Sequence, residues 1–281
     1  MRRVLLVDGD VIAFIAAAAV QNTWEDTAGY VWPFANTAEG EAAVENLLHG
    51  LKFNLRADDM RVFLTHEVNW RKQLDPEYKA NRKDSVRPLL LSRLREYLRE
   101  KHGAETWANL EADDVVSILG TEDVENETRI ICGKDKDFLG IPAPYHRLGD
   151  DKGAIVEPTL AEANLFHLAQ TLAGDRVDNY TGCPGLGMER AQRLLEDPVV
   201  LKPTKGIITR GKNKGQEVTK WVSEPTDDLW ACVVSQFLKA GLTEDDALRN
   251  ARLAYLLRAE DYDQQTGRIT LWVPEKLKLK E

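Results

Sequence analysis

The feature that most constrains the fold is a pattern that occurs three times in the first half of the chain. Each time, a short apolar run rich in leucine and β-branched residues stops abruptly beside an ionisable residue. The three runs and the residues that follow them are RVLLV (3–7) with Asp8, RVFLT (61–65) with His66, and RIIC (129–132) with Asp135. Runs of this length and composition predict buried strands. Helices are predicted between them, at about 38–55, 88–101 and 111–120.

Alternating strands and helices predict an α/β fold with a mostly parallel, doubly wound sheet flanked by helices. In such a sheet the functional crevice lies outside the carboxyl ends of the strands. All three predicted strands bring an ionisable side chain to that edge. This coincidence constrains the position of a site more than any single motif does.

The second half of the chain carries helical rather than strand signals. Residues 160–174 have helical spacing and end at a glycine, and 181–197 combine a glycine-rich hairpin with a helix. Residues 225–260 contain further amphipathic helix, whereas 206–221, rich in glycine and lysine, predict an exposed loop or hairpin. The sequence therefore predicts a largely helical portion after the α/β portion.

Composition argues against a membrane protein and against a disulfide-stabilised one. The longest apolar stretch near the N-terminus, VIAFIAAAAV (11–20), is too short to span a bilayer. Cys132, Cys183 and Cys232 are few, widely spaced and odd in number. Such cysteines fit a reducing cytoplasm and neither a disulfide framework nor a zinc motif. We therefore expect a cytoplasmic protein with no membrane partner.

The formal net charge of −9 argues against a nucleic-acid partner, but the distribution of the charge does not. Residues 71–101 contain ten Lys/Arg and five Asp/Glu, and residues 202–220 contain six Lys/Arg and one acid, Glu217. Each segment therefore carries a charge of +5. Either segment alone is explained by solvated surface charge, but a chain with two such segments is able to hold a polyanion locally.

Four acidic clusters stand at predicted loop or helix-start positions. They are Asp8 with Asp10; Glu111 with Asp113 and Asp114; Asp135 with Asp137; and Asp175 with Asp178. An acid at a helix start is commonly a cap or a partner of the helix dipole, so no single cluster predicts a site. If all four clusters reach one crevice, their repulsion becomes large. Two unit charges about 4 Å apart repel by roughly 4 kcal/mol at an effective dielectric near 20.

Such a group of carboxylates must either protonate or bind cations. Oxygen ligands favour Mg²⁺ or Mn²⁺ over zinc, and paired hard cations are typical of phosphoryl transfer. The basic segment YKANRK (78–83) supplies a positive counterpart. Within it, Lys79 and Arg82 are suited to phosphate, and Tyr78 offers a stacking face.

Six short motifs together resemble a known family. VDGD, YKANR, EADD, KDKDF, GDRVDN and GCPGLG occur here, over roughly residues 4–195, in the order seen in the flap endonuclease and 5′→3′ exonuclease family. The segments NWRKQLDPEYKANRK and GKNKGQEVTKW resemble most closely the exonucleases of short-tailed bacteriophages, which extends the resemblance across most of the chain.

The resemblance implies a particular arrangement of domains. Residues 1–158 are expected to form a PIN-like nuclease core with a helical arch or clamp at about 71–101. Residues 159–281 are expected to form a helical DNA-binding portion with a helix–three-turn–helix motif. The glycine hairpin at 181–190 and a basic loop at about 202–220 belong to this second portion.

The resemblance also implies roles for individual residues. The first metal site is expected at Asp8, Glu111, Asp113 and Asp114, and the second at Asp135, Asp137, Asp175 and Asp178. Lys79 and Arg82 match the catalytic basic residues that approach the scissile phosphate. Contacts to nucleic acid are expected from Tyr78, Lys83, Gly185, Gly187 and Arg190. The implied cofactors are two or more Mg²⁺ or Mn²⁺ ions, with K⁺ a further expectation at the glycine hairpin.

Two positions depart from the family pattern. Where relatives usually end the second core strand with an aspartate of the first metal site, this chain has His66 followed by Glu67. A histidine after a strand is either structural or a ligand, and Glu67 or Asp10 are alternative substitutes. Glu189 stands where many relatives carry a lysine, which weakens the expected phosphate contact of that helix, although Arg190 follows it.

The sequence thus predicts a divalent-metal-dependent 5′→3′ exonuclease that acts on duplex DNA with 5′ ends or flaps, and on RNA–DNA hybrids. It is expected to act as a monomer in the host cytoplasm during phage DNA replication or degradation, with flap endonuclease activity left open. One alternative is a phosphatase of the haloacid dehalogenase type, with Asp8 as nucleophile and Asp10 as acid/base. That alternative leaves EADD, YKANR and the glycine hairpin unexplained. A second alternative is a nucleic-acid-binding protein without catalysis, which the intact set of acids disfavours.

Overall fold

The computed structural model describes residues 1–150 and 153–278, and the chain forms two compact units. The first unit consists of Met1–Gln73, Arg82–Leu160 and Leu256–Thr270. The second consists of Leu74–Asn81, Ala161–Tyr255 and Leu271–Glu281. The break at Leu160 lies two residues from the boundary expected from the sequence. Two segments of the chain, 74–81 and 256–270, nevertheless belong to the unit on the other side of that break.

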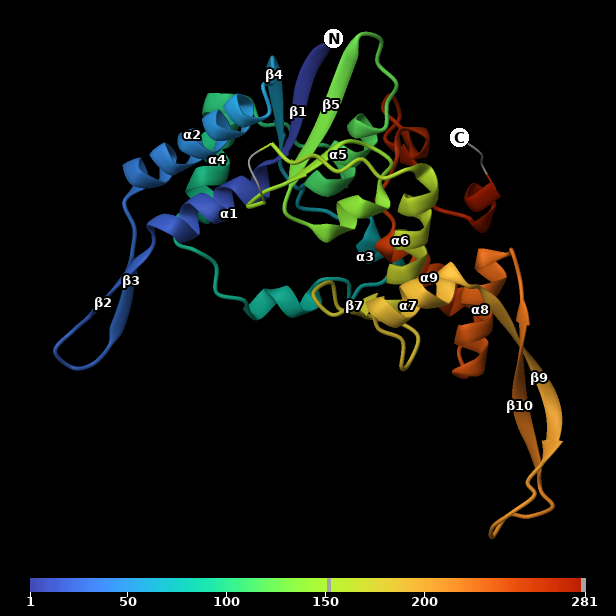
Figure 1. Ribbon diagram of the computed structural model, residues 1–281. Coiled ribbons are helices and arrows are strands. Elements are labelled where there is room, and N and C mark those ends of the chain that lie inside the picture. The colour runs from blue at the N-terminus through green and yellow to red at the C-terminus, as the bar shows by residue number, and fades with distance from the viewer. Residues whose placement is uncertain (151–152, 279–281) are drawn as a thin grey trace. The chain divides into compact units, whose positions relative to one another are not determined.

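The first unit is built on a four-stranded sheet whose strands are all parallel (Figure 1). Its strands, in spatial order, are β4 (Asp59–Phe63), β1 (Arg2–Asp8), β5 (Glu127–Gly133) and β6 (Tyr145–Arg147). Residues 4–8 of the central strand β1 are all buried, as expected for a parallel sheet covered on both faces. The predicted α/β fold with a parallel sheet flanked by helices is confirmed.

Helices cover this sheet because successive side chains of β1 point to opposite faces. Leu5 and Val7 pack in one hydrophobic cluster with side chains from the first, second and fourth helices. The helix that begins at Ala112 contacts β1 and β5. The helices of this unit are α1 (Gly9–Val20), α2 (Thr37–Asn54), α4 (Leu91–His102) and α5 (Ala112–Gly120). The short helix α3 (Arg71–Leu74) ends, and the 3-10 turn η1 (Ala80–Asp84) begins, in the segment 74–81 of the second unit. The predicted arch segment 71–101 therefore contains α3, η1 and most of α4.

A hairpin that the sequence patterns did not predict follows α1. Its strands are β2 (Asn22–Glu25) and β3 (Val31–Phe34), and all eight residues are exposed. Trp24 lies directly opposite Trp32, and the Trp32 indole N–H donates to the Asp26 carboxylate at 3.0 Å. This bond is the largest of the causes that lower the pKa of Asp26. The hairpin carries aromatic side chains that a strand of a globular core would bury.

The segment 256–270 returns to the first unit after the helices of the second. The Ala259 N–H donates to the Thr121 hydroxyl at 2.9 Å, and Arg258 donates to the Gly140 carbonyl at 3.2 Å. The elements here are η3 (Ala259–Asp261), β11 (Tyr262–Asp263) and β12 (Arg268–Ile269). The amphipathic helix expected within 225–260 is confirmed, and it ends at Ala254, after which the chain continues as a loop.

The second unit is largely helical, as predicted. Its helices are α6 (Leu160–Ala173), α7 (Met188–Glu196), α8 (Leu229–Lys239) and α9 (Glu244–Ala254), with η4 at Pro274–Lys278. Its strands are β7 (Gly174–Asp175), β8 (Tyr180–Thr181), β9 (Val199–Ile207) and β10 (Glu217–Pro225). β9 and β10 pair along their whole length, so the basic segment expected to be a loop or hairpin is a hairpin. Its strands are longer than the segment 206–221 indicated.

The tight turn after α6 depends on glycine. A Cβ on Gly174 would lie 2.1 Å from the Gly182 backbone nitrogen, and a Cβ on Gly182 would lie 2.2 Å from the Ala173 carbonyl carbon. Gly174 also has φ of +69°. These close approaches let β7 and β8 pair immediately after the helix, which fixes the turn that carries Asp175 and Asp178.

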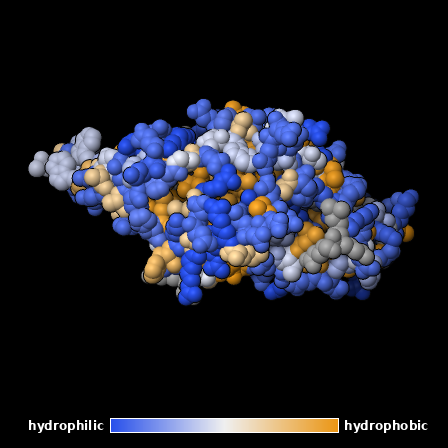
Figure 2. All heavy atoms as spheres, turned by 90° about the horizontal axis from the view of Figure 1, so that it is seen from above, coloured by the Kyte–Doolittle hydropathy of each residue, from blue (hydrophilic) through white to orange (hydrophobic). Residues whose placement is uncertain are grey.

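Hydrophilic residues cover most of the face seen in Figure 2, and apolar residues appear there only in scattered patches. No helix within the described residues is both long enough and apolar enough to cross a membrane.

Candidate active site

The carboxyl ends of β1, β4 and β5 meet at one edge of the first unit's sheet. Asp8 ends β1 and lies opposite Phe63, the last residue of β4. Val7 lies opposite Cys132, which brings Asp8 level with the end of β5, and Asp135 follows two residues later. The predicted convergence of the three strand ends is therefore confirmed.

Asp8 is buried at this edge and is repelled by other acids. Its Oδ1 accepts hydrogen bonds from the backbone N–H groups of Asp10 (3.0 Å) and Val11 (3.2 Å), which caps α1. Burial, followed by the charge of Asp10 and then that of Asp135, raises the pKa of Asp8 to about 7. A cation beside Asp8 offsets these causes, because it stabilises the charged carboxylate.

Asp135 and Asp137 stand on the loop after β5, where the 3-10 turn η2 (Lys136–Gly140) begins. Asp135 is exposed, and its Oδ1 accepts a hydrogen bond from the Asp137 N–H at 3.0 Å. The Tyr145 hydroxyl donates to the Asp135 backbone carbonyl at 2.9 Å, which fixes the loop to β6. The loop thus presents the Asp135 carboxylate to water. The same carboxylate is close enough to Asp8 for its charge to raise the pKa of Asp8.

The acids at the start of α5 have different surroundings from one another. Glu111 is the N-cap residue, but its side chain makes no capping bond. The Thr65 hydroxyl oxygen instead accepts a hydrogen bond from the Ala112 N–H at 3.1 Å. Glu111 is buried and lies 3.1 Å from Arg71, whereas Asp113 is half-buried. Since Thr65 provides the cap, the Glu111 carboxylate does not have to.

Asp114 is fully buried, and both of its oxygens are saturated with donors. Oδ2 accepts from Arg71 Nη1 (2.7 Å) and Trp70 Nε1 (3.0 Å). Oδ1 accepts from Arg71 Nη2 (2.8 Å) and from the Leu257 N–H (3.3 Å). A carboxylate offers about four acceptor positions, so no oxygen of Asp114 remains directed at a cation. In this structure Asp114 holds Arg71, Trp70 and the Leu257 N–H, and its predicted role as a metal ligand stays a prediction.

His66 occupies the position where the resemblance leads one to expect an aspartate. Two backbone N–H groups, those of Val68 (3.1 Å) and Asn109 (3.3 Å), donate to its Nδ1. Nδ1 also lies 3.3 Å from the Val68 carbonyl oxygen, so all three contacts of this nitrogen are to the backbone of neighbouring loops. The contacts of His66 are those of a residue that shapes the loop after β4.

The two acids that could replace the missing aspartate, Asp10 and Glu67, differ in their surroundings. Asp10 lies 2.8 Å from Arg95, and its Oδ2 accepts a hydrogen bond from the Thr65 N–H at 2.9 Å. Glu67 is exposed. Asp10 is therefore held by partners of the first unit, while Glu67 faces water.

The donor chemistry of this edge fits Mg²⁺, although the side chains do not enclose an ion. Within residues 1–150 and 153–278, no three carboxylate, imidazole or thiol side chains stand close enough together to hold one ion. Mg²⁺ keeps several waters and is usually bound through one or two carboxylates plus substrate phosphates. Asp8 and Asp135 at neighbouring strand ends are two carboxylates of the kind that such an ion takes.

The remaining predicted metal ligands, Asp175 and Asp178, lie in the second unit together with Tyr78 and Lys79. The Tyr78 hydroxyl donates to Asp178 Oδ2 at 2.9 Å, and Lys79 Nζ lies 3.7 Å from the same oxygen. The Lys79 backbone N–H donates to the Asp178 carbonyl at 2.9 Å. Asp175 Oδ1 accepts from the Val177 N–H at 2.7 Å. Four of the predicted site residues therefore come together here.

Side-chain amides hold these two segments against each other. Asn81 Nδ2 donates to the Arg176 carbonyl at 3.1 Å, and Asn179 Nδ2 donates to the Glu77 carbonyl at 2.7 Å. Lys79 and Asn179 have φ of +56° and +62°, a conformation that is uncommon outside glycine. Strained backbone of this kind persists where the surroundings over-determine it and is common at functional sites. Lys79 is held in such a conformation by contacts on both sides.

Arg82 and Lys83, the next predicted phosphate contacts along the chain, are exposed on η1. Arg82 belongs to the first unit, whereas Lys79 belongs to the second. The structure therefore brings Lys79 to Asp178, and it places Arg82 and Lys83 in exposed positions.

The predicted glycine hairpin precedes α7. Gly185 has φ of +82°, and a Cβ on either Gly185 or Gly187 would meet nothing within 4 Å. Gly187 is the N-cap residue of α7 and has no side chain to cover the helix start. Arg190 Nη1 donates to the Gly185 carbonyl at 3.1 Å, and Glu189 pairs with Arg193 at 2.6 Å. The open side of the hairpin suits a phosphate, as backbone amides at helix starts commonly do.

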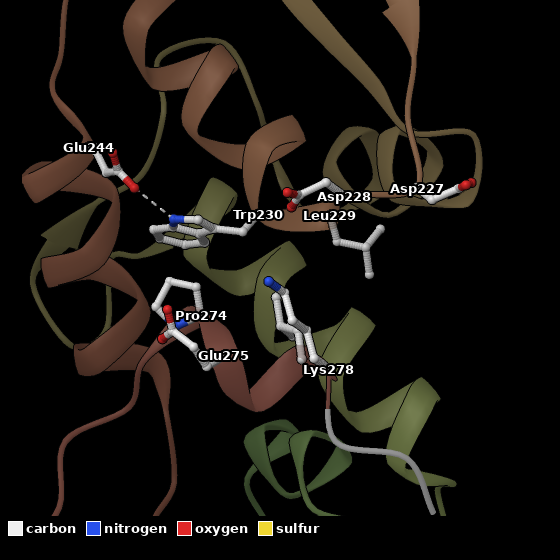
Figure 3. Close-up of a pocket in the computed structure, with 9 residues that line it drawn as sticks. Asp227, Asp228, Leu229, Trp230, Glu244, Pro274, Glu275 and Lys278 are labelled. Carbon is white, nitrogen blue, oxygen red and sulfur yellow. Dashed lines mark hydrogen bonds between the residues drawn. The ribbon is translucent and has the colours of Figure 1, made fainter.

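A separate hollow of about 500 Å³ lies in the second unit beside α8 (Figure 3). Trp230 forms one side, and its indole N–H donates to Glu244 at 2.9 Å. The other lining residues are Asp227, Asp228, Leu229, Pro274, Glu275, Leu277 and Lys278. Four carboxylates and one lysine make this hollow unsuited to phosphate.

Sequence reasoning missed the two arginines that organise the acids of the first unit. Arg71 is 1% exposed, and Arg95 contacts both Asp10 and the Thr65 carbonyl (2.9 Å). Both lie in the basic segment 71–101, whose charge the sequence alone assigns to a solvated surface. The sequence gives no signal for these contacts, because arginine is mostly exposed and is fully buried only where a partner meets it in the fold.

Comparison with known proteins gives a consistent result. Residues 3–159 match the family described as "5'-3' exonuclease, N-terminal resolvase-like domain". The chain is 34% identical to the exodeoxyribonuclease of Enterobacteria phage T3 and 34% identical to the exonuclease of Escherichia phage T7, each over 96% of this chain and 93% of the relative. It is 32% identical to flap endonuclease Xni of Shewanella baltica over 47% of this chain and 54% of that relative.

A solved structure has the same fold. The D15 protein of phage T5, co-crystallised with metal ions, matches with a TM-score of 0.55 at 16% identity, over 91% of this chain and 90% of that one. A complex of the D15 flap endonuclease with DNA and metal ions matches with the same TM-score.

Proposed function

Because this chain belongs to the 5′→3′ exonuclease family, we propose that the acids at the carboxyl edge of its sheet hold Mg²⁺ for the hydrolysis of DNA from 5′ ends. The chain is a metal-dependent nuclease with the 5′→3′ exonuclease and flap nuclease activity of its family. The observation that supports the position of the ions is geometric: Asp8, at the end of β1, and Asp135, two residues past the end of β5, come to the same edge of the sheet.

Different acids have different parts in this proposal. Asp8 and Asp135 bind Mg²⁺ directly, and Asp113, Asp137 and Glu111 bind it directly or through water. A bound divalent cation polarises a water molecule and offsets the charge that develops on the phosphate. Asp114 acts indirectly, since it holds the Arg71 guanidinium that also contacts Glu111. Arg71 thereby fixes the position of the Glu111 carboxylate.

The proposed phosphate contacts are Lys79, in the second unit, and Arg82, in the first, and the remaining acids lie in the second unit. Asp175 and Asp178 are proposed as ligands of a second ion, on the strength of the GDRVDN motif. Lys79 donates to the scissile phosphate, with Arg82 as a second donor, and Tyr78 positions Asp178 through its hydroxyl. At 3.7 Å from Asp178, the Lys79 ammonium is beyond direct hydrogen-bond distance of that oxygen, so a phosphate oxygen competes for it easily.

The substrate is proposed to be duplex DNA with free 5′ ends or flaps, and RNA–DNA hybrids. α6, the turn after it and α7 are proposed to act as the helix–three-turn–helix, with Gly185 and Gly187 facing a phosphate or a K⁺ ion. Lys83 and Arg190 are further proposed contacts to nucleic acid. We propose that the protein acts as a monomer in the cytoplasm of the host cell.

The test is hydrolysis of a 5′-labelled duplex in Mg²⁺ and in EDTA. We expect EDTA to abolish product, and an Asp135→Ala plus Asp137→Ala variant to lose at least about 10³-fold in turnover, because the loss of preorganised charge stabilisation costs that much. The matched control is Asp123→Ala plus Glu125→Ala, which removes two exposed acids with the same spacing before β5. Cleavage without metal, or full activity of the first variant, would contradict the proposal.

A further inference from the structure

The β9–β10 hairpin, residues 199–225, is an extended ribbon of the second unit, in which β9 contacts α8 (Figure 1). Nine residue pairs run from Val199 opposite Pro225 to Ile207 opposite Glu217. At the base, Leu201 is buried and the Thr226 N–H donates to the Pro198 carbonyl at 3.0 Å. Beyond the base, nearly all side chains of both strands are exposed. The ribbon has no hydrophobic core of its own, so packing does not explain which side chains it carries.

The ribbon is strongly basic in an acidic chain. Its charged residues are Lys202, Lys205, Arg210, Lys212, Lys214, Lys220, Glu217 and Glu224. They give it a charge of +4, while the whole chain carries −9. Lys202 is paired with Glu224 near the base. The excess positive charge therefore lies towards the far end of the ribbon.

The tip, residues 208–216, holds three basic side chains on a closed turn that contains no acid. The Ile208 N–H donates to the Gln216 carbonyl at 3.0 Å, and the Gly215 N–H donates to the Ile208 carbonyl at 2.9 Å. Gly211 and Gly215, with φ of +86° and +89°, allow the chain to reverse here. Among the described residues, Arg210, Lys212 and Lys214 have no carboxylate partner, so the tip presents three uncompensated cations to water.

We propose that this ribbon binds the phosphate backbone of the duplex part of the substrate, a contact additional to those of the glycine hairpin. The inference deepens the proposed function and rests on it. Nine paired residues at about 3.3 Å each give a ribbon of roughly 30 Å, close to one turn of B-form DNA, about 34 Å. A two-stranded ribbon also fits the major groove, about 12 Å wide.

The composition of the ribbon favours duplex over single-stranded nucleic acid. Binding of single strands relies on exposed aromatic faces on which bases stack. The ribbon has one aromatic residue, Trp221, which is half-buried and lies opposite Pro203. Its exposed side chains offer charge rather than stacking surfaces. Such contacts carry no sequence information, which suits a nuclease that acts at any 5′ end.

The test removes the three tip charges in an Arg210→Gln, Lys212→Gln, Lys214→Gln variant. The matched control, Lys52→Gln, Lys239→Gln, Lys278→Gln, removes three exposed lysines from the ends of α2, α8 and η4, outside both basic segments. Affinity for a labelled 30-base-pair duplex is measured in EDTA between about 50 and 200 mM KCl. Each lost phosphate contact lowers the slope of log K against log salt by about 0.9. We expect the tip variant to lose about 2 to 3 in slope and at least about tenfold in affinity at 50 mM KCl.

Three comparisons decide the outcome. A tip variant that matches the control variant in salt slope and duplex affinity would overturn the proposal. If the affinity of the tip variant for a labelled single strand falls as much as its affinity for the duplex, the assignment of the ribbon to duplex is wrong. The rate of single-turnover cleavage in Mg²⁺ at saturating duplex should stay within about twofold of the unaltered protein. If the unaltered protein fails to cleave, the proposed function fails, while the salt slopes still decide whether the ribbon binds duplex.

Discussion

The two units each contain a pair of opposite charges, and the pairs differ in how completely they are enclosed. In the first unit, Arg71 and Asp114 are 1% and 0% exposed and are joined by two hydrogen bonds, of 2.7 and 2.8 Å. In the second, the Lys79 and Asp178 side chains are 13% and 15% exposed, and their closest charged atoms are 3.7 Å apart. Both acids were expected from the sequence to bind metal.

The difference separates a structural pair from a functional one. The buried Arg71 guanidinium donates to both oxygens of the Asp114 carboxylate. It cannot exchange this partner for another without leaving an unpaired charge in the core. A lysine at 3.7 Å on a partly exposed acid exchanges partners cheaply, because water and other anions reach it. We infer that Asp114 stabilises the fold and that Lys79 and Asp178 act on the substrate. Three changes test this distinction.

The largest effect is expected for Asp114→Ala. This change leaves the Arg71 charge buried without its main partner, so the free energy of unfolding should fall by about 3–5 kcal/mol. Urea unfolding followed by circular dichroism measures the loss. An Arg71→Met plus Asp114→Leu variant replaces the pair with apolar side chains and should recover much of it.

The neighbouring acid supplies the control for this prediction. Asp113 is half-buried on the same turn, and Asp113→Ala should change the free energy of unfolding by less than about 1 kcal/mol while lowering turnover. If Asp113→Ala destabilises the protein as much as Asp114→Ala does, the distinction between structural and functional acids on α5 fails.

A smaller effect, on turnover only, is expected for Lys79→Ala. Loss of a donor that acts in the transition state should lower the single-turnover rate by about 10²–10³-fold and duplex affinity by much less. The exposed Lys83 gives the contrast, since Lys83→Ala removes a contact to the backbone and should weaken binding more than turnover. Equal losses of rate and affinity in Lys79→Ala would mean that this lysine only anchors the DNA.

Periodicity and composition predicted the parts of the molecule that depend on burial. The strands that end at Asp8 and before Asp135 could be predicted because a parallel strand covered on both faces has a continuous apolar run. The helices that follow them could be predicted from apolar spacing. The carboxyl edge followed from the topology, since parallel strands place their ends on one side.

The parts that could not be predicted depend on which partner a residue meets. Nothing in the sequence distinguishes Asp114, which meets Arg71, from Asp113 one residue earlier. The β2–β3 hairpin was missed because Trp24 and Trp32 are exposed, so they give no alternation of apolar and polar residues. The return of 256–270 to the first unit was missed because a contact such as Thr121 with Ala259 spans 138 residues of chain.

The smallest effect is expected at His66. Its variants test whether this residue stabilises the fold, as Asp114 does, or acts in the reaction, as Lys79 does. If Nδ1 only accepts the backbone N–H groups of Val68 and Asn109, an asparagine places its side-chain oxygen in a similar position. His66→Asn should then keep turnover and the Mg²⁺ requirement within about threefold, and His66→Ala should cost about 1–3 kcal/mol of stability through two unsatisfied N–H groups. A role of His66 as metal ligand would instead raise the Mg²⁺ requirement of both variants about 10- to 100-fold, the usual cost of disturbing a metal's immediate surroundings. Magnesium titration of the cleavage rate therefore decides whether His66 belongs with Asp114 or with Lys79.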